Sequence, residues 1–384
     1  MRQTAGVTWL LWVSALSLLV WVWLVCCHGL FWRTDQRLPP RPAPRRWPSV
    51  AVVVPARDEA AVLPLSLPGL LGQKYPGTAR VVLVDDHSSD GTGALAARLG
   101  DGGGLPLTVA VPPALPAGWT GKLWALRHGV ELAGDADYLL LTDADIAHGP
   151  SLLADLVAAA EANRLDLVSQ MARLRVATGW ERLVVPAFVY FFAQLYPFRW
   201  SNRPGARTAA AAGGCTLVRR SALERAGGVA AIRGAVIDDV SLARAVKRTG
   251  GRTWLGLAEQ ADSVRPYPHL GGLWRMVSRS AYAQLRHSPV LLAGTVAGLA
   301  LVYLVPPVAL AAGAATGSAG AAVLGGAAWA LMAGSYVPML RYYGRPAPAA
   351  LLLPFTAGLY LLMTVDSAVQ HWRGRGAAWK GRTY

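Results

Sequence analysis

The hydrophobic positions of this chain are concentrated at its two ends. No Asp, Glu, Lys or Arg occurs between Gln3 and Trp32, and a helix of about 20 apolar residues is long enough to cross a bilayer. A cleavable signal peptide is the alternative, but this apolar run is too long and no Ala-x-Ala site follows it. We therefore predict an uncleaved membrane anchor over residues 1–32, followed by a basic, proline-rich linker over residues 33–48.

The second uncharged stretch extends from Ser288 to Leu340. As a single helix it would be about 80 Å long, far longer than a bilayer is thick, and a Gly- and Ala-rich segment in its middle offers a turn. We predict a membrane region over residues 288–370, with spans at about 290–312, 321–340 and 349–369. Three spans would place the basic tail, residues 371–384, on the side opposite to the linker, against the positive-inside tendency. A re-entrant or interfacial course of the last segment is therefore an open alternative.

Residues 49–287 alternate between apolar runs typical of buried strands and segments with a helical pattern. The strand-like runs are SVAVVVPA, ARVVLVDD, LPLTVAVP and ADYLLLTDADI. Continuous rather than alternating apolar strands indicate burial on both faces, and hence a mostly parallel sheet. We predict a domain of the α/β class.

Charge and cysteine content narrow the possible partners. The formal net charge is +15, and 53% of the residues are hydrophobic. Anionic lipid headgroups and a phosphorylated substrate account for this charge, whereas no nucleic-acid-binding module accompanies it, so nucleic acid is not an expected partner. Cys26 and Cys27 fall in the anchor and Cys215 stands alone, which leaves neither a disulfide framework nor a zinc spacing.

Acidic residues follow three of the four predicted strands. The pairs are Asp58 and Glu59, Asp85 and Asp86, and Asp143 and Asp145. In parallel sheets ligands bind beyond the carboxyl ends of the strands. One such pair commonly caps a turn or a helix, but three pairs at one edge indicate a binding site. Because oxygen ligands favour hard divalent ions, we interpret Asp143 and Asp145 as ligands of a Mg²⁺ or Mn²⁺ ion that bridges to a diphosphate.

The sequence lacks the motifs of two common classes of phosphate-binding protein, the dinucleotide-binding proteins and the P-loop proteins. The turn after the first strand reads PARDEAAVLP and contains no glycine, unlike the G-x-G-x-x-G turn of dinucleotide-binding proteins, and no P-loop motif occurs.

Six motifs instead resemble, in their order, those of the family 2 glycosyltransferases with the GT-A fold. They are VVVPARDE, VDDHSSDGT, GKLWALRHG, TDAD, GGCTLVRR and VIDDVSLARAVKRTGG, between about residues 49 and 286. More narrowly, GWTGKLWA, LGLAEQADSVRPY, LWRMVSRSAYAQLRHSP and the tail WRGRGAAWKGR are similar to the hopanoid-associated membrane glycosyltransferases of bacteria. The resemblance implies a GT-A type nucleotide-diphospho-sugar transferase domain over residues 49–287, with transmembrane helices at both ends of the chain.

The resemblance also implies roles for single residues in binding the donor. Asp58, Asp85 and Asp86 would hold the uridine of a UDP-sugar, with turn capping as the alternative. Lys122 would lie near the diphosphate, although it fits equally well as a surface helix lysine. Asp143 and Asp145 match the metal-binding D-x-D motif.

Further assignments concern the reacting centre. In VIDDV, Asp239 matches the position of the general base and Asp238 precedes it, where family members commonly have Glu; both are also suited to cap the helix that follows. Gly214, after Gly213, would let the backbone approach the sugar. Arg275 and Arg279 would contact the diphosphate, with a role as interfacial cations as the alternative.

These assignments predict an inverting, metal-dependent transferase that moves one sugar to a lipid acceptor, for which the resemblance suggests a hopanoid. Chain-elongating polysaccharide synthases carry a Q-x-x-R-W motif, which LWRMVSRSAY lacks. A processive synthase, a polyprenyl-phosphate glycosyltransferase and, least favoured, a non-catalytic membrane scaffold are the alternatives. The expected location is the bacterial inner membrane, as a multi-pass protein with its catalytic domain facing the cytoplasm.

The aromatic segment from Glu181 to Trp200 separates the D-x-D motif from the proposed base. A membrane span here would place the two halves of one site on opposite sides of the bilayer. We therefore predict an interfacial helix over residues 181–200, with packing in the protein core as the alternative.

Overall fold

The computed structural model describes residues 2–375, 378–379 and 382–383. The chain divides into two compact units. The helical unit comprises Met1–Thr34, Val176–Pro197 and Tyr267–Ala377, and the sheet unit comprises Asp35–Arg175, Phe198–Pro266 and Ala378–Tyr384.

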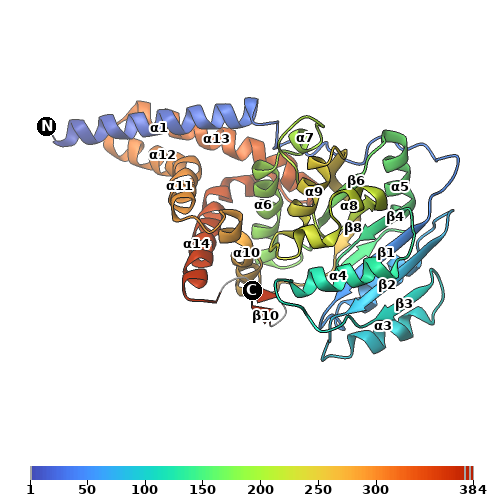
Figure 1. Ribbon diagram of the computed structural model, residues 1–384. Coiled ribbons are helices and arrows are strands. Elements are labelled where there is room, and N and C mark those ends of the chain that lie inside the picture. The colour runs from blue at the N-terminus through green and yellow to red at the C-terminus, as the bar shows by residue number, and fades with distance from the viewer. Residues whose placement is uncertain (1, 376–377, 380–381, 384) are drawn as a thin grey trace. The chain divides into compact units, whose positions relative to one another are not determined.

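The sheet unit is built on a mixed sheet, whose strands run in the order β3-β2-β1-β4-β7-β6-β8-β5 (Figure 1). The strands are β1 (Val50–Ala56), β2 (Ala79–Asp85), β3 (Leu107–Ala110), β4 (Tyr138–Leu141), β5 (Ile146–His148), β6 (Leu167–Arg173), β7 (Thr216–Arg219) and β8 (Thr253–Ser263). Two short strands near the end of the chain, β9 (Ala378–Trp379) and β10 (Arg382–Thr383), pair with each other.

The first four strands confirm the predicted parallel arrangement. β1 pairs in parallel with both β2 and β4, and β2 pairs in parallel with β3. β7 then runs antiparallel to β4 and to β6. The carboxyl ends of β1, β2 and β4 therefore share one edge of the sheet, as the positions of the acidic residues predicted.

Helices cover both faces of this sheet. Successive residues of β1 point to opposite faces, and both sets of side chains are buried in a core cluster. Val52 and Val54 belong to the core cluster that includes Leu67 and Leu156, whereas Ala51 and Val53 belong to a second cluster on the other face. The helices of the unit are α2 (Leu63–Leu71), α3 (Thr92–Gly100), α4 (Gly121–Leu132), α5 (Leu152–Asn163), α7 (Phe198–Ser201), α8 (Arg220–Arg225), η1 (Val229–Ile232) and α9 (Asp238–Arg248). The predicted α/β class is confirmed.

The helical unit contains the apolar ends of the chain. Its helices are α1 (Arg2–Cys27), α6 (Gly179–Leu195), α10 (Leu270–Gln284), α11 (Pro289–Leu299), the π-helical turn η2 (Ala300–Leu304), α12 (Val305–Thr316), α13 (Ala319–Tyr342), η3 (Ala347–Leu352) and α14 (Leu353–Trp372). Within the described residues, four stretches are long and apolar enough to cross a membrane: Thr8–Cys27, Pro289–Thr316, Ala319–Tyr342 and Ala347–Trp372. They coincide with the expected anchor and the three expected C-terminal spans.

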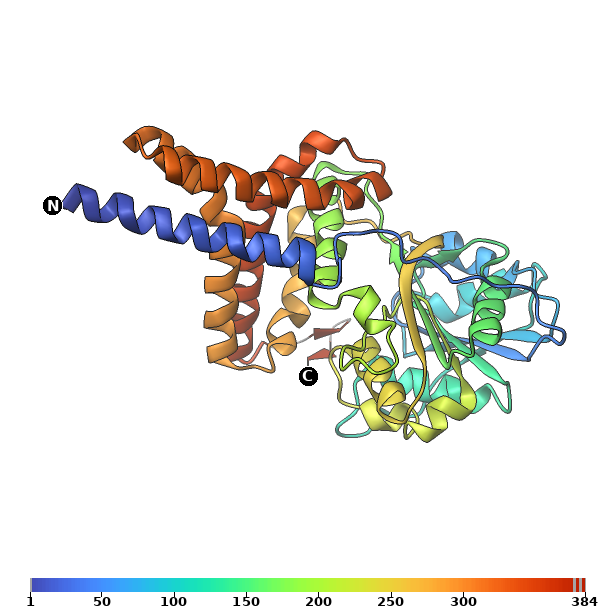
Figure 2. The same cartoon turned by 90° about the horizontal axis from the view of Figure 1, so that it is seen from above.

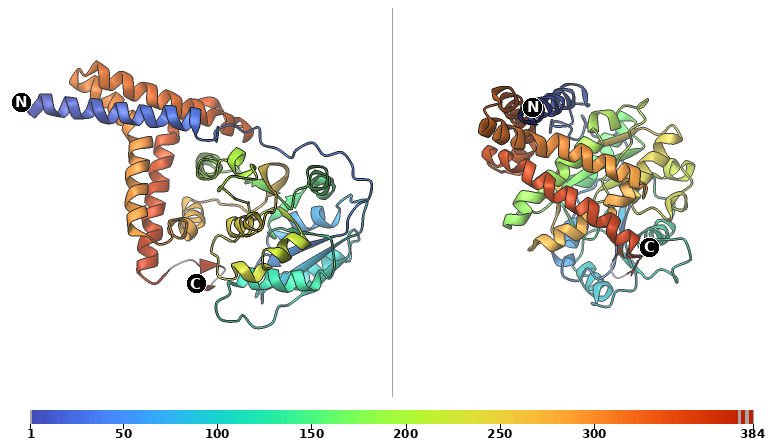
Figure 3. Two further views of the ribbon diagram at one scale, coloured as in Figure 1. Left: turned by 45° about the horizontal axis from the view of Figure 1, so that its top comes forward. Right: turned by 90° about the vertical axis from the view of Figure 1, so that its left-hand side faces the viewer.

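The apolar helices of this unit follow two directions. α1 and α13 lie side by side and run the same way (Figure 2). α11 and α14 also lie side by side, but they run transverse to α1 and α13 (Figure 3).

Helix α6 is the segment predicted to lie at the membrane interface. It begins with a capping box, in which Thr178 and Glu181 each satisfy backbone N–H groups of the first turn. Its Tyr190 hydroxyl lies 2.6 Å from Ser335 Oγ on α13, and the Tyr360 hydroxyl of α14 donates to Val184 O at 3.0 Å. One face of α6 thus packs on the apolar helices, while its interfacial orientation stays a prediction. Of the predicted tail, residues 376–377, 380–381 and 384 lie outside the described residues.

Candidate active site

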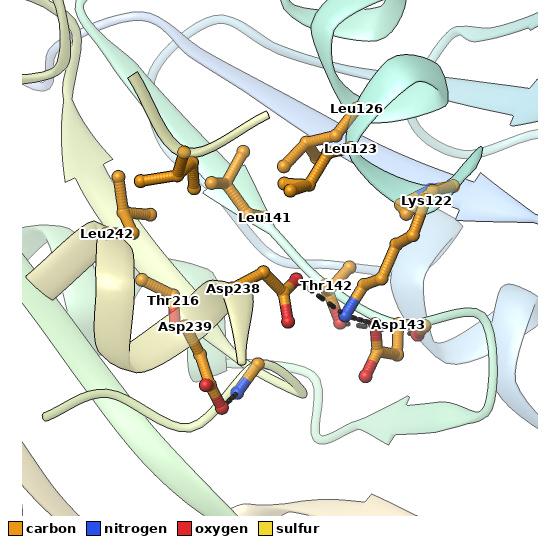
Figure 4. Close-up of a pocket in the computed structure, with 13 residues that line it drawn as sticks. Lys122, Leu123, Leu126, Leu141, Thr142, Asp143, Thr216, Asp238, Asp239 and Leu242 are labelled. Carbon is orange, nitrogen blue, oxygen red and sulfur yellow. Dashed lines mark hydrogen bonds and ion pairs between the residues drawn. The ribbon is translucent and has the colours of Figure 1, made fainter. Parts of the chain in front are cut away.

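A pocket opens in the sheet unit where β1 and β4 end. Its lining combines apolar residues of α4, β4 and α9 with charged groups (Figure 4). The charged groups are Lys122, Asp143, Asp238 and Asp239. Four of the residues singled out in the sequence thus come together in one cavity.

Lys122 is the central cation of this pocket. It stands in the first turn of α4, which Thr120 caps by accepting a hydrogen bond from Leu123 N. Its Nζ lies 2.8 Å from Asp143 Oδ1 and 3.0 Å from Asp238 Oδ2. Although burial works to lower it, these carboxylates raise the pKa of Lys122 above its ordinary value. The lysine is therefore charged and joins the loop after β4 to the start of α9.

Asp239 lies in the first turn of α9, beside this cation. Its Oδ2 accepts a hydrogen bond of 2.9 Å from Gly213 N, and its Oδ1 accepts one of 2.7 Å from Val240 N. Burial, followed by the charge of Asp238, raises the pKa of Asp239 to about 7. A carboxylate with this pKa is suited to take up a proton near neutral pH. Its bond to Val240 N also fits the alternative role of a helix cap.

Asp145, the second acid of the D-x-D motif, has partners that the sequence analysis did not identify. Its Oδ2 accepts hydrogen bonds from Ser263 Oγ at 2.8 Å and Arg265 Nε at 3.3 Å. The Nη2 atom of Arg265 also donates to both carboxylate oxygens of Glu59, at 2.8 and 2.7 Å. Arg265 thus connects the loop after β1 to the loop after β4. The only signal for it was its place in the motif LGLAEQADSVRPY, directly after a strand.

The acids proposed to bind uridine lie in the loops after β1 and β2. Asp58 Oδ1 accepts hydrogen bonds from Ser89 N and Ser89 Oγ, at 2.8 and 3.2 Å. Asp85 Oδ1 accepts one from Ser88 N at 3.0 Å. The Oδ2 atom of the buried Asp86 lies 3.7 Å from Nη1 of Arg57. All three carboxylates stabilise these loops, as the capping alternative predicted. Their binding of uridine stays a prediction.

The two glycines of GGCTLVRR have different surroundings. Gly213 lines the pocket, and a Cβ placed on it would lie 3.4 Å from Lys122 Nζ. A Cβ on Gly214 would meet Ile146 Cδ1 at 3.1 Å instead, and Gly214 O accepts a hydrogen bond of 2.7 Å from Thr142 Oγ1. Gly214 thus allows close packing beneath the D-x-D loop, and its contact with the sugar stays a prediction.

Arg275 and Arg279 lie on α10, in the helical unit, and both are exposed there. Their assignment to the diphosphate stays a prediction.

The carboxylates around Lys122 are candidate ligands of a divalent cation. Among the described residues, no group of three or more His, Cys, Asp or Glu side chains is placed to hold a metal ion. Magnesium sites in nucleotide-binding enzymes, however, commonly use one or two carboxylates together with substrate phosphates and water. Three carboxylates surround the single ammonium of Lys122, and burial raises the pKa of Asp143. This excess of acidic charge and the oxygen-only donors fit a hard cation that arrives with a diphosphate.

Residues 51–227 match the model of the family described as Glycosyl transferase family 2. The matched region is similar to family 2 glycosyltransferases and covers somewhat less than half of the chain. It contains β1 to β7, Lys122 and the D-x-D motif, whereas Asp238, Asp239 and Arg265 follow it. No match was found among curated proteins.

Solved structures show the fold. Mannosyltransferase PcManGT from Pyrobaculum calidifontis, in complex with GDP-Man and Mn²⁺, is 20% identical with a TM-score of 0.56, over 94% of this chain and 99% of that one. At this identity the likeness shows the fold alone, and it is the predicted GT-A fold. TarS of S. aureus, residues 1–349 in complex with UDP-GlcNAc, is 13% identical with a TM-score of 0.41, over 85% of this chain and 92% of that one.

Proposed function

We propose that the protein is a membrane-bound, inverting glycosyltransferase that moves a single sugar from a nucleotide-diphosphate donor to a lipid acceptor. The observation that carries this proposal is the cluster in which Lys122 lies between Asp143 and Asp238, with Asp239 beside them, at the end of β1 and β4. Half-buried acids and a cation in one pocket of a GT-A domain supply both parts of sugar transfer, a base for the acceptor and charge for the leaving diphosphate.

Asp239 acts as the general base. Its carboxylate takes the proton of an acceptor hydroxyl while that oxygen attacks the anomeric carbon of the sugar. The bond from this carbon to the diphosphate oxygen breaks on the opposite face, so the configuration inverts and the nucleoside diphosphate leaves. The hydrogen bonds from Gly213 N and Val240 N orient the carboxylate.

Lys122 and the D-x-D acids act on the diphosphate. The ammonium of Lys122 is a compact donor suited to phosphate oxygens, and it would exchange part of its contact with Asp143 for the donor. Asp143 and Asp145 would hold a Mg²⁺ or Mn²⁺ ion, which stabilises the charge that develops on the leaving group. Asp145 is kept in place by Ser263 and Arg265.

The donor is proposed to be a UDP-sugar, with Asp58, Asp85 and Asp86 around the uridine, Gly214 near the sugar, and Arg275 and Arg279 near the diphosphate. A GDP-sugar belongs in the same test, since PcManGT was solved with GDP-Man. The apolar helices support a lipid acceptor, for which a hopanoid is the first candidate and a polyprenyl phosphate the second. The absence of Q-x-x-R-W supports a single transfer. The proposed location is the bacterial inner membrane, with the catalytic domain facing the cytoplasm.

Donor hydrolysis and donor binding by the purified full chain test the chemistry. With Mn²⁺ or Mg²⁺, the wild type should release UDP or GDP from one sugar nucleotide, while Asp239→Asn and Asp145→Ala should lose most of this activity. Asp101→Asn, at the exposed end of α3, is the matched control. Calorimetry should show tighter binding of the nucleoside diphosphate with Mn²⁺ than with a chelator, and Asp145→Ala should remove the difference. Wild-type hydrolysis by both site variants would reject the assignment.

Product analysis tests the acceptor. Separate reactions are run with a hopanoid alcohol, with a polyprenyl phosphate and without added lipid. The true acceptor should give one product that carries one added sugar, and the reaction without lipid should give none. A ladder of products would favour the processive alternative.

A further inference from the structure

The apolar stretch Pro289–Thr316 is bent in the middle. α11 ends at Leu299, the π-helical turn η2 follows, and α12 begins at Val305. Pro306 and Pro307 stand directly after the turn. A proline has no N–H group and its ring collides with the carbonyl four residues earlier. The carbonyls of Val302 and Tyr303 therefore cannot receive their usual helical hydrogen bonds.

Two side chains of α1 donate hydrogen bonds to backbone carbonyls at this bend. Trp21 Nε1 donates to Val302 O at 2.6 Å, and Ser17 Oγ donates to Leu301 O at 2.8 Å. Ser17 and Trp21 are four residues apart, which places them on one face of α1, and both are fully buried. Since an unpaired carbonyl is costly in hydrocarbon, the bond from Trp21 to the freed carbonyl of Val302 stabilises the bent form, and Ser17 adds a bond to the neighbouring carbonyl of Leu301. The bend is thus built into the packing of η2 on α1.

The bend gives α11 and α12 different directions. α12 packs against α1 and α13, whereas α11 packs against α14 and runs transverse to them (Figure 3). α11 has 11 residues, so it is only about 16 Å long at 1.5 Å per residue. A bilayer core is about 30 Å thick, so α11 by itself is too short to cross it. The segment of η2 and α12, Ala300–Thr316, is longer, at about 25 Å.

Three helices form one transverse layer. The rings of His287, before α11, and His371, at the end of α14, are stacked with their centroids 4.1 Å apart. The end of α14 therefore lies beside the beginning of α11. α10 joins this layer, because Trp274 Nε1 donates to Asp366 Oδ2 at 2.8 Å and Tyr282 N donates to Ser367 Oγ at 3.0 Å.

The exposed face of α14 is apolar. Phe355, Leu362 and Trp372 are more than half exposed, at 57%, 54% and 58%, whereas the hydroxyl residues Thr356, Thr364 and Ser367 are buried among apolar neighbours. Such an exposed face fits acyl chains rather than water. Exposed arginines lie on α10 and beside the ends of α11 and α14: Arg275, Arg279, Arg286, Arg373 and Arg375. Arginines at this level attract anionic headgroups.

We propose that the layer of α10, α11 and α14 lies along the surface of an anionic bilayer, while α1, α13 and the segment of η2 and α12 cross it. The inference rests on the proposed function only in requiring a membrane. In this arrangement α12 leads to the turn at Gly317 and Ser318 on the far side, and α13 returns. The chain beyond Trp372 then leaves on the side where His287 lies. The chain then crosses three times rather than four, and only two of these crossings follow the linker. The basic tail and the linker therefore lie on the same side, in agreement with the positive-inside tendency.

Depth measurements on spin-labelled variants test the orientation of α14. The exposed native cysteines Cys26 and Cys27 are first replaced by serine, and the buried Cys215 is kept. Nitroxides at Phe355→Cys and Leu362→Cys, one heptad apart on the exposed face, are compared in vesicles of phosphatidylethanolamine and phosphatidylglycerol. The matched pair Val323→Cys and Ala330→Cys lies one heptad apart on the exposed face of α13. A helix that crosses the bilayer upright changes depth by about 10 Å in seven residues.

The expected result is a depth difference of that order for the α13 pair and nearly equal depths for the α14 pair. A difference of about 10 Å within the α14 pair overturns the proposal. Labelling of intact spheroplasts by an impermeant maleimide supplies the second measurement. Ser318→Cys should react before lysis and Arg373→Cys only after it, whereas reaction of Arg373→Cys in intact spheroplasts overturns the proposal. Carbonate extraction reports membrane insertion separately, and donor hydrolysis reports the proposed function separately.

Discussion

The ammonium of Lys122 lies 2.8 Å from the Oδ1 atom of Asp143, in a pocket that holds two further carboxylates. This ion pair joins the first turn of α4 to the D-x-D loop. The cation also lowers the pKa of Asp239, against the effect of burial. Lys122 therefore influences both the diphosphate and the proposed base.

Replacement of Lys122 tests this double role. Lys122→Met should lower kcat/KM for the donor by about 100-fold, since it removes a positive group where charge develops in the transition state. It should also move the acidic limb of the pH profile to higher pH, because Asp239 loses a neighbouring positive charge. Lys122→Arg should restore the position of the limb, and Lys74→Met, an exposed position in the same unit, is the control. A uniform loss of activity without any shift of the limb would contradict the coupling.

The pKa of Asp239 predicts the pH dependence of the reaction. The base must be unprotonated, so kcat/KM should rise with pH and level off above about pH 7, the value to which burial and Asp238 raise this pKa. Asp238→Asn removes a charge that raises the pKa, so its limb should lie at lower pH than that of the wild type. Asp239→Asn should lose activity by roughly 1000-fold and lose the limb. A wild-type profile in Asp239→Asn would exclude this residue as the base.

The same group predicts the pH dependence of folding stability. The pKa of Asp239 is about 7 in the folded protein, above its ordinary value of 3.8. The folded state therefore binds this proton more tightly than the unfolded state, and its contribution is present below about pH 4 and is lost as the pH rises through 7. Relative to the wild type, the melting temperature of Asp239→Asn should be higher at pH 8 than at pH 5. A constant difference across this range would show that the group titrates alike in both states.

The pair of Glu59 and Arg265 predicts a coupling in stability. The side chain of Glu59 is 8% exposed and that of Arg265 is 27% exposed. Arg265→Met leaves a buried carboxylate without this partner and should destabilise the protein by about 2 kcal/mol, less than for a fully buried pair because water screens the arginine. Adding Glu59→Gln should recover part of the loss. Purely additive effects in this double-mutant cycle, measured by thermal unfolding, would mean that the pair is not coupled.

The neighbouring glycines predict two separate effects. In Gly213→Ala the new Cβ meets Lys122 Nζ at 3.4 Å and Asp239 Oδ2 at 3.6 Å, so activity should fall while the melting temperature changes little. In Gly214→Ala it meets Ile146 Cδ1 at 3.1 Å and Ala172 Cβ at 3.4 Å, which should destabilise the protein by about 1 kcal/mol. Each variant is the control for the other in parallel assays of unfolding and donor hydrolysis. Equal effects of both variants on both assays would contradict the distinction.

Local patterns in the sequence determined the elements and the edge where the site lies. The continuous apolar run of β1 specifies a strand buried on both faces, and the acids directly after β1, β2 and β4 follow the strands to the same edge. Lys122 and Asp239 belonged to short motifs, so each was found without knowledge of its partner. Their meeting in one pocket, and the pKa that burial gives Asp239, depend on distances between segments far apart in the chain.

Only the tertiary structure decided the contacts between distant segments and the directions of the apolar helices. Arg265 is 206 residues from Glu59, and no local pattern predicts that the two side chains meet. A hydropathy pattern identifies apolar helices, but it contains no information on their direction, so residues 290–312 read as one straight span. The bend at η2 is stabilised by Ser17 and Trp21, which donate hydrogen bonds to the carbonyls of Leu301 and Val302. Both donors are more than 280 residues away from these carbonyls in the sequence. Local propensity forms the helices, whereas hydrogen bonds between remote residues set their directions.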